Sequence, residues 1–313
     1  MKLAKIASQI DGQPMFKILE HAQKLERAGH DVIHFELGEP DFDTPPHIVD
    51  SCVKALRSGD THYAPASGVF SFKEAVANAT GHSRGFKPTH DQILVTPGAN
   101  SVIYLAFKCM LYEGDEVLIP DPGFPTYTTA ILACGGLPVY VPLSESTGFS
   151  MSAGEVRSRI TERTKAIIVN SPSNPTGGIT SREDLEAIYE IARQHDLLLI
   201  SDEIYSRMVF EKHEFFSPSM LDRASERVLV LNGFSKAFAM TGWRLGVAIG
   251  PIQLIEKMTL LTSTIVSCVP PFIQMAGIAA IAGPQEVAKE MLKQYQERCR
   301  ILVDGLNNFP SIT

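Results

Sequence analysis

Short apolar runs recur along the middle of the chain and alternate with stretches of helical periodicity. The runs are almost continuously hydrophobic, which is typical of strands covered on both faces. Strands that alternate with helices indicate a mainly parallel sheet. We therefore predict a three-layer α/β/α fold with a mainly parallel seven-stranded sheet. The predicted strands are 92–96, 116–120, 137–142, 166–170, 197–201, 228–232 and 246–250.

Helical periodicity separates most of these strands and also precedes the first of them. The stretch that ends at His195 begins with Ser181 and Asp184 in the spacing of a capping box. A polar amphipathic helix with several charges is predicted near the end of the chain. The predicted helices are 14–29, 46–57, 99–112, 124–134, 181–195 and 285–308.

The composition indicates a globular chain and argues against several classes of partner. The 313 residues are 44% hydrophobic and 20% charged, with a formal net charge of -7. That charge argues against nucleic acid or an anionic membrane as the main partner. The start of the chain is too briefly apolar for a signal peptide, and no run approaches the roughly 20 apolar residues of a membrane span. The five cysteines contain no C-x-x-C pair. We predict a cytoplasmic protein with reduced thiols.

An unusual lysine follows the sixth predicted strand. Lys236 lies among Phe234, Ala237, Phe238 and Met240, where desolvation favours a neutral, nucleophilic amine. Eight residues later comes an arginine, a planar cation that suits a phosphate group. The plain alternative is a lysine that extends from a strand end to solvent, followed by an arginine in a surface ion pair.

Polar residues follow other strands as well, at the strand ends where parallel sheets bind ligands. The turn Gly98-Ala99-Asn100 opens a helix, and its free N–H groups suit a phosphate, although an ordinary turn would look the same. Asn174 is presented by a loop made rigid by two prolines and two glycines. Asp202 follows a buried strand, where a carboxylate needs a strong partner.

These segments resemble the pyridoxal-phosphate (PLP) enzymes of the aspartate aminotransferase fold, in particular the class I and II aminotransferases. The resemblance extends from Gly38 to about Ile281. It implies that Lys236 forms a Schiff base with PLP. It also implies that Ser235, Arg244 and the turn at 98–100 bind the cofactor phosphate.

The same resemblance implies roles for four further residues at the strand ends. Asp202 would pair with the protonated pyridine nitrogen. Asn174 and Tyr205 would donate to the phenolic oxygen, with Asn174 also contacting the substrate. Phe124 would stack on the ring, although a core phenylalanine is a fair alternative. Lys236, Asp202 and Tyr205 are the expected catalytic residues.

Two segments before the sheet complete the resemblance. Gly38, in the extended segment Gly38-Glu39-Pro40-Asp41-Phe42, would lie over the substrate carboxylate. The plain alternative is that this segment is a linker between domains. Tyr63 matches a tyrosine that reaches the cofactor phosphate of the neighbouring subunit. The resemblance therefore implies a homodimer with shared active sites, whereas the plain alternative for Tyr63 is a half-buried loop residue.

The reaction implied is transfer of an amino group between an L-amino acid and a 2-oxo acid. Alternatives are another PLP reaction, such as a β- or γ-elimination, ring formation or racemisation, or a truncated PLP-binding chain with little activity. We expect residues 1–43 to form an arm and helix of a small domain, 44–283 the large PLP-binding domain, and 284–313 the incomplete remainder of the small domain. The arginine that binds the substrate α-carboxylate cannot be assigned. No metal-binding motif is present.

Overall fold

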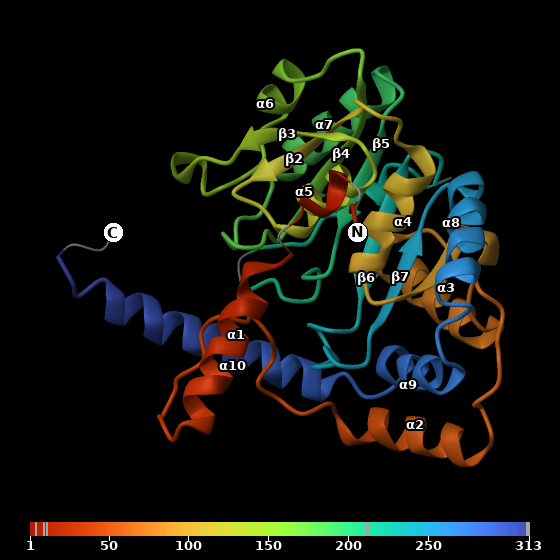
Figure 1. The fold of residues 1–313 in the computed structure, drawn as a ribbon, viewed down its shortest axis with the longest axis vertical. Coiled ribbons are helices and arrows are strands. Elements are labelled where there is room, and N and C mark those ends of the chain that lie inside the picture. Colours follow the sequence, from red (N-terminus) through yellow and green to blue (C-terminus); the bar gives the residue numbers. More distant parts are fainter. Residues whose placement is uncertain (4, 9, 11, 211–212, 224, 311–313) are drawn as a thin grey trace.

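A seven-stranded sheet forms the centre of the molecule (Figure 1). The computed structural model describes residues 1–3, 5–8, 10, 12–210, 213–223 and 225–310. The strand order is β1-β7-β6-β5-β4-β2-β3, and β7 runs antiparallel to both of its neighbours while the other described pairs are parallel. The predicted mainly parallel sheet is confirmed. The strands are β1 (Ile93–Pro97), β2 (Glu116–Asp121), β3 (Leu137–Pro142), β4 (Thr164–Asn170), β5 (Leu198–Asp202), β6 (Val228–Gly233) and β7 (Leu245–Ile249).

Helices cover both faces of the sheet and produce the predicted three layers (Figure 1). One face is covered by α3 (Phe70–Arg84), α6 (Ala153–Ser158), α7 (Arg182–Gln194) and α9 (Pro271–Ala282), with α2 (Pro46–Arg57) packed against α9. The other face is covered by α4 (Asn100–Met110), α5 (Thr126–Ala133) and α8 (Ile252–Ile265). The short 3-10 helices are η1 (Lys5–Ser8), η2 (His90–Gln92), η3 (Glu145–Thr147) and η4 (Pro218–Met220).

Alternate residues of each strand supply the two halves of the hydrophobic core. In β1, Ile93 and Val95 face the layer of α3 and α9, whereas Leu94 faces α4 and α8. All three side chains are fully buried. Because both faces are covered, neither face needs polar side chains, which explains the continuous apolar runs in the sequence.

Helix α7 begins where the capping-box spacing predicts. The Ser181 hydroxyl accepts a hydrogen bond from the Asp184 backbone N–H at 3.0 Å, which satisfies one of the free N–H groups of the first turn. Asp184 in turn accepts a bond from the backbone N–H of Ala153, at the start of α6, at 2.9 Å. The cap therefore also joins two helices of one layer.

Helices α1 (Pro14–Arg27) and α10 (Glu286–Leu306) lie beyond one end of the sheet (Figure 1). Both are largely exposed: Ala22 is the buried residue of α1 and Met291 that of α10. None of the helices in the described ranges has the length and hydrophobicity that crossing a membrane requires. The division at residues 43 and 283 stays a prediction, and its last three residues, 311–313, lie outside the described part of the chain.

The strand register places one set of strand ends along a single edge of the sheet. Asn170 at the end of β4 pairs with Asp202 at the end of β5, and Asp202 pairs with Leu231 near the end of β6. Pro97, at the end of β1, pairs with Leu245, at the start of β7. The loops that follow β1, β4 and β5 and the loop that joins β6 to β7 therefore meet at this edge.

Candidate active site

Asp202 carries a buried carboxylate at the end of β5. The Tyr127 hydroxyl donates a hydrogen bond to its Oδ2 at 2.7 Å, and the Ile204 backbone N–H donates to its Oδ1 at 3.2 Å. Burial raises the pKa of Asp202 to about 6, although both hydrogen bonds oppose that rise. Neither of these donors is a cation. Within the described residues, the carboxylate therefore lacks the charged partner that a buried anion requires.

Asn174 and Tyr205 lie together beside this carboxylate's strand. The Asn174 side-chain amide donates to the Tyr205 hydroxyl at 3.4 Å, and the Asn174 backbone N–H donates to the Asn170 side chain at 2.8 Å. Asn170 also donates to the Asp202 backbone carbonyl at 3.2 Å. Burial, with a smaller effect of Asp202, raises the pKa of Tyr205 to about 12, so the phenol remains a hydrogen-bond donor at neutral pH.

Lys236 lies half-buried in the loop after β6. Its Nζ donates a hydrogen bond to the Gly38 backbone carbonyl. Burial lowers the pKa of Lys236 and nearby Arg244 lowers it further, while Glu39 acts in the opposite direction. A lowered pKa increases the fraction of neutral, nucleophilic amine.

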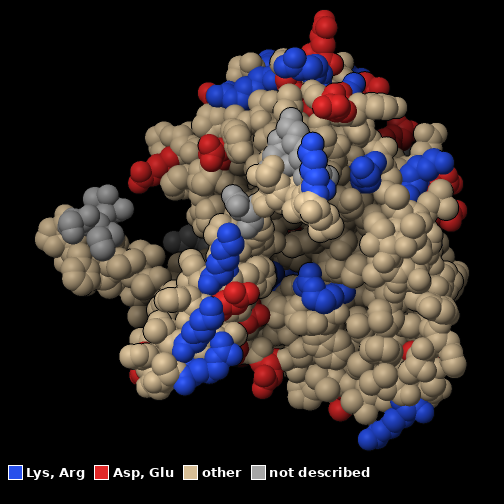
Figure 2. All heavy atoms as spheres, in the orientation of Figure 1, with Lys and Arg blue, Asp and Glu red and all other residues tan. Residues whose placement is uncertain are grey.

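Two cavities adjoin these groups. Lys236 lines one of about 320 Å³ beside α10, whereas Asn174 and Tyr205 line another of about 640 Å³, and Met208 lines both. The space-filling view shows a hollow between α1 and the body of the molecule, with Lys or Arg atoms at its edge (Figure 2). Lys236 and Asp202 form no hydrogen bond with each other within the described ranges.

Arg244 and the turn at Gly98 meet at the same edge of the sheet. A Cβ placed on Gly98, whose φ is +77°, would lie 2.2 Å from Nη2 of Arg244. The Arg244 guanidinium also donates to the Thr241 carbonyl at 2.9 Å. Gly246 has a related requirement, because a Cβ there would lie 2.5 Å from the backbone N of Ala99. The predicted phosphate-binding residues Gly98, Ala99 and Arg244 are therefore neighbours.

The remaining predicted residues lie around this cluster. Asn100 begins α4, and Ser235 is half-buried next to Lys236. Phe124 packs edge to face on Tyr127, with ring centroids 5.7 Å apart. Tyr63 is 89% exposed. Its contact with the phosphate of the neighbouring subunit stays a prediction.

The structure adds residues to which the sequence assigned no role. Tyr127 contacts Asp202, and Thr44 joins the segment after Gly38 to the lysine loop. The Thr44 hydroxyl donates to the Ala239 carbonyl and accepts from the Trp243 indole N–H at 2.9 Å. The pairing of Thr44 with Trp243 spans almost 200 residues and leaves no local pattern. For Tyr127, the spacing of three positions from Phe124 predicts the contact between the two rings but not the hydrogen bond to Asp202.

The chemistry of this donor set fits PLP. Asp202 is a buried carboxylate without a cation among the described residues, and a protonated pyridine nitrogen would supply one. Gly98 and Arg244 bring a backbone turn and a guanidinium together, which suits a phosphate. Lys236 is a desolvated amine on the adjacent loop. Within the described residues, no group of three or more His, Cys, Asp or Glu is placed to hold a metal ion.

Comparison with known proteins gives the same family over almost the whole chain. The model of the family "Aminotransferase class I and II" matches residues 30–312. An aspartate aminotransferase of Geobacillus stearothermophilus is 39% identical over 100% of this chain and 80% of its own length. An aromatic-amino-acid aminotransferase of Thermococcus litoralis is 37% identical, over 98% of this chain and 79% of its own.

Solved structures agree with the sequence comparison. The aspartate aminotransferase of Thermus thermophilus with maleate superposes with a TM-score of 0.93 at 35% identity, covering 98% of this chain and 81% of that one. An aspartate aminotransferase from Rhizobium meliloti also gives 0.93, at 35% identity and with 99% and 78% covered. The chain belongs to the class I and II aminotransferases, enzymes that transfer amino groups between amino acids and 2-oxo acids with pyridoxal 5′-phosphate as cofactor.

Proposed function

We propose that the residues gathered at the carboxyl ends of β1, β4, β5 and β6 form the PLP site of this aminotransferase. Lys236 is the amine to which the cofactor aldehyde attaches, and Asp202 pairs with the ring nitrogen. Asn174 and Tyr205 donate to the phenolic oxygen. The phosphate is held by Ser235, Arg244 and the turn Gly98-Ala99-Asn100, and Phe124 lies against the ring.

The observation that carries this proposal is the uncompensated carboxylate of Asp202. Its oxygens accept one phenol and one backbone N–H, and neither donor neutralises its charge. A buried anion without a cation is costly, and a ligand that brings a cation removes that cost. Lys236, on the loop after the neighbouring strand β6, is the desolvated amine that we assign to this ligand.

Each of these residues has a separate role in the proposed reaction. When bound, PLP supplies an electron-poor ring that accepts the electron pair released with the substrate α-proton. Ionised Asp202 keeps the ring nitrogen protonated. The Nζ of Lys236, neutral in part because burial lowers its pKa, accepts the α-proton and later returns it. Asn174 and Tyr205 hold the ring in place by hydrogen bonds to one oxygen.

Borohydride trapping tests the assignment of the lysine. Reduction of the cofactor-loaded protein should make the attachment permanent, and peptide mapping should place the label on Lys236. Lys236→Ala should lose the label, whereas Lys289→Ala, which alters another lysine lining the same cavity, should keep it. A label on a different lysine would refute the assignment.

The substrates of this family are amino acids and 2-oxo acids. Relatives are named as aspartate and aromatic-amino-acid aminotransferases, so we propose aspartate and the aromatic amino acids as the first candidates. Each amino acid should be mixed with the loaded enzyme in a single half-reaction. A substrate should release one 2-oxo acid per site; release of free ammonia would indicate an elimination instead.

We further propose a cytoplasmic homodimer in which Tyr63 reaches the neighbouring subunit's phosphate site and Gly38 lies over the substrate. The 89% exposure of Tyr63 supports this arrangement, since a large aromatic side chain in water gains stability from a partner surface. The bond from Lys236 to the Gly38 carbonyl supports a position for Gly38 next to the reacting groups.

A further inference from the structure

Tyr127 is a fully buried tyrosine that the mechanism above does not use. It lies in the first turn of α5, is 1% exposed, and belongs to the core between the sheet and the α4–α5–α8 layer. Its hydroxyl nevertheless donates a hydrogen bond to Oδ2 of Asp202 at 2.7 Å, and the two residues lie 75 positions apart in the sequence. A phenol inside a hydrophobic core needs such a partner, and this one is the carboxylate that faces the cofactor ring in the proposed site.

The surroundings of Tyr127 hold its hydroxyl in one position. Its ring packs edge to face against Phe124, with the ring planes at 84°. The side chain has two rotatable bonds, and core packing leaves them little freedom. Asp202 is consequently fixed at both oxygens, by the phenol at Oδ2 and by the Ile204 N–H at Oδ1.

We propose that Tyr127 is a positioning residue that orients the Asp202 carboxylate and keeps it ionised for pairing with the cofactor's ring nitrogen. This inference rests on the proposed PLP site. It concerns a residue that touches Asp202 and not the reacting atoms.

The electrostatics of the site give the direction of the effect. Burial raises the pKa of Asp202 and the neighbouring Glu203 adds to the rise, whereas the phenol of Tyr127 and the N–H of Ile204 lower it by stabilising the ionised form. Tyr205 is a further titratable group that interacts with both Asp202 and Tyr127. Burial and Asp202 hold the pKa of Tyr127 far above its usual value, so Tyr127 donates its hydrogen bond without losing its proton at physiological pH.

Removing the hydroxyl should therefore change how cofactor binding depends on pH. A protonated Asp202 must lose its proton before it can pair with a protonated ring nitrogen, so affinity should fall about tenfold for each pH unit below the pKa of the carboxyl. For the wild type the fall should begin near pH 6. A hydrogen bond to a charged group contributes enough to shift this point upward by about one to two pH units in Tyr127→Phe.

The test measures the PLP dissociation constant of the full chain from about pH 5 to about pH 9 for three proteins. These are the wild type, Tyr127→Phe, and Tyr189→Phe, which removes a hydroxyl from a half-buried tyrosine on α7. Thermal unfolding of each protein checks that it is folded. The proposal requires that the curve of Tyr127→Phe moves to higher pH while the curve of Tyr189→Phe coincides with that of the wild type.

Two results would overturn the proposal. A uniform loss of affinity at every pH would mean that Tyr127 only packs, and a curve identical to that of the wild type would mean that its hydroxyl is irrelevant. Both differ from failure of the proposed function, in which the wild type itself would bind no PLP or would carry it on a lysine other than Lys236.

Discussion

The absence of a side chain at Gly98 allows Arg244 to approach the turn after β1, the two elements that we propose to bind the phosphate. The turn after β1 adopts a φ of +77° at Gly98, a conformation that residues with a Cβ rarely adopt. The guanidinium of Arg244 lies against this turn, within 2.2 Å of where a Cβ would be. Glycine thus satisfies two requirements at one position, the backbone conformation and the space for the arginine.

Gly98→Ala should weaken PLP binding by at least tenfold, because the new methyl group displaces the Arg244 guanidinium. Gly114→Ala is the matched control, since Gly114 also has a positive φ, +88°, but nothing lies within 4 Å of its Cβ position. Both variants should lose about 1–2 kcal/mol of stability from the strained φ, and only Gly98→Ala should lose affinity. Cofactor titration and urea unfolding measure the two effects; equal affinities in both variants would contradict the steric argument.

Asp202 should make the stability of the cofactor-free protein depend on pH. Its pKa of about 6 in the folded state lies above the ordinary 3.8. The folded state therefore binds the Asp202 proton more tightly than the unfolded state does. This proton contributes its full stabilisation of the folded state below pH 3.8, and the contribution is lost as the pH rises through 6. Asp202→Asn cannot ionise, so above pH 6 it should be more stable than the wild type, by on the order of 3 kcal/mol.

Unfolding of the cofactor-free proteins at about pH 5 and about pH 8 measures this difference, which should grow with pH. Asp31→Asn, at an exposed position, should unfold like the wild type at both values. A difference that is the same at the two pH values would show that Asp202 is ionised without cost in the folded protein.

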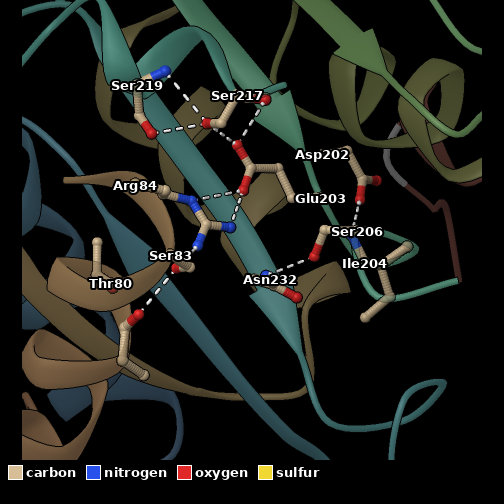
Figure 3. Close-up of polar contacts among 12 residues, drawn as sticks. Thr80, Ser83, Arg84, Asp202, Glu203, Ile204, Ser206, Ser217, Ser219 and Asn232 are labelled. Atoms are coloured by element: carbon tan, nitrogen blue, oxygen red, sulfur yellow. Dashed lines mark hydrogen bonds and ion pairs between the residues drawn. The ribbon is translucent and has the colours of Figure 1, made fainter. Parts of the chain in front are cut away.

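At the scale of secondary-structure elements, a buried ion pair attaches α3 to the end of β5 (Figure 3). Arg84, the last residue of α3, donates to the Glu203 carboxylate through Nε at 3.1 Å and through Nη2. The Arg84 side chain is 11% exposed and that of Glu203 1%. The Ser217 and Ser201 hydroxyls donate to the other oxygen of Glu203. Glu203 directly follows Asp202, so this network also restrains the backbone at the aspartate of the proposed site.

Arg84→Met should lower the free energy of unfolding by about 3–5 kcal/mol, because it leaves Glu203 charged, buried and without its cation. Adding Glu203→Gln should recover part of the loss, since the second change removes the unpaired charge. Arg193→Met breaks an exposed pair with Glu190 and should cost less than about 1 kcal/mol. Urea unfolding of the four proteins checks these values; equal losses in Arg84→Met and Arg193→Met would show that burial adds nothing to the pair.

Most of the sheet was predictable from the sequence, because each strand is a short run buried on both faces. β3 was predicted at its observed bounds, and β1, β5 and β7 were each displaced by one residue. The antiparallel direction of β7 was not specified, since direction depends on the length and course of a connection and not on the apolar pattern. Helices α3, α6, α8 and α9 were not predicted; in α3 and α9 the hydrophobic residues show little helical periodicity.

The candidate site was predictable where it follows from strand ends and from family resemblance. Asp202 ends β5, and Asn174 and Lys236 lie in the loops that follow β4 and β6, so parallel-sheet geometry places all three near one edge. The partners Tyr127 and Arg84 are different, because α5 and α3 bring them from distant parts of the chain. The spacing of Phe124 and Tyr127 predicts only their ring contact, so the bonds to Asp202 and Glu203 became visible only in the folded structure.

At the scale of the whole molecule, one face of α2 and the loop after it leave apolar side chains in water. Ile48, Cys52 and Ala55 are buried, whereas the adjacent positions Val49, Val53 and Leu56, spaced at one helical turn, are 36–43% exposed. Tyr63 follows on the same part of the chain at 89% exposure. An apolar stripe beside an exposed tyrosine supports the proposed homodimer, because a second copy would cover both.

If Tyr63 completes the neighbour's active site, two defective chains should restore each other. Lys236→Ala abolishes the site in which it lies, and Tyr63→Phe weakens the site of the partner. A mixed dimer then has one site with both defects and one with neither. Unfolding and refolding the two variants together should form such dimers, and about a quarter of all sites should regain wild-type activity. The measurement is aminotransferase activity of the mixture against that of each variant refolded alone.

The control pair is Lys236→Ala mixed with Asp202→Asn, two defects that we place within a single chain's site. A mixed dimer of these variants has one defect in each site, so no intact site can form and activity should not recover. Recovery with Tyr63→Phe and none with Asp202→Asn therefore requires that the tyrosine acts across the subunit boundary. If neither mixture recovers while both variants form dimers, Tyr63 serves its own chain and the shared-site arrangement is wrong.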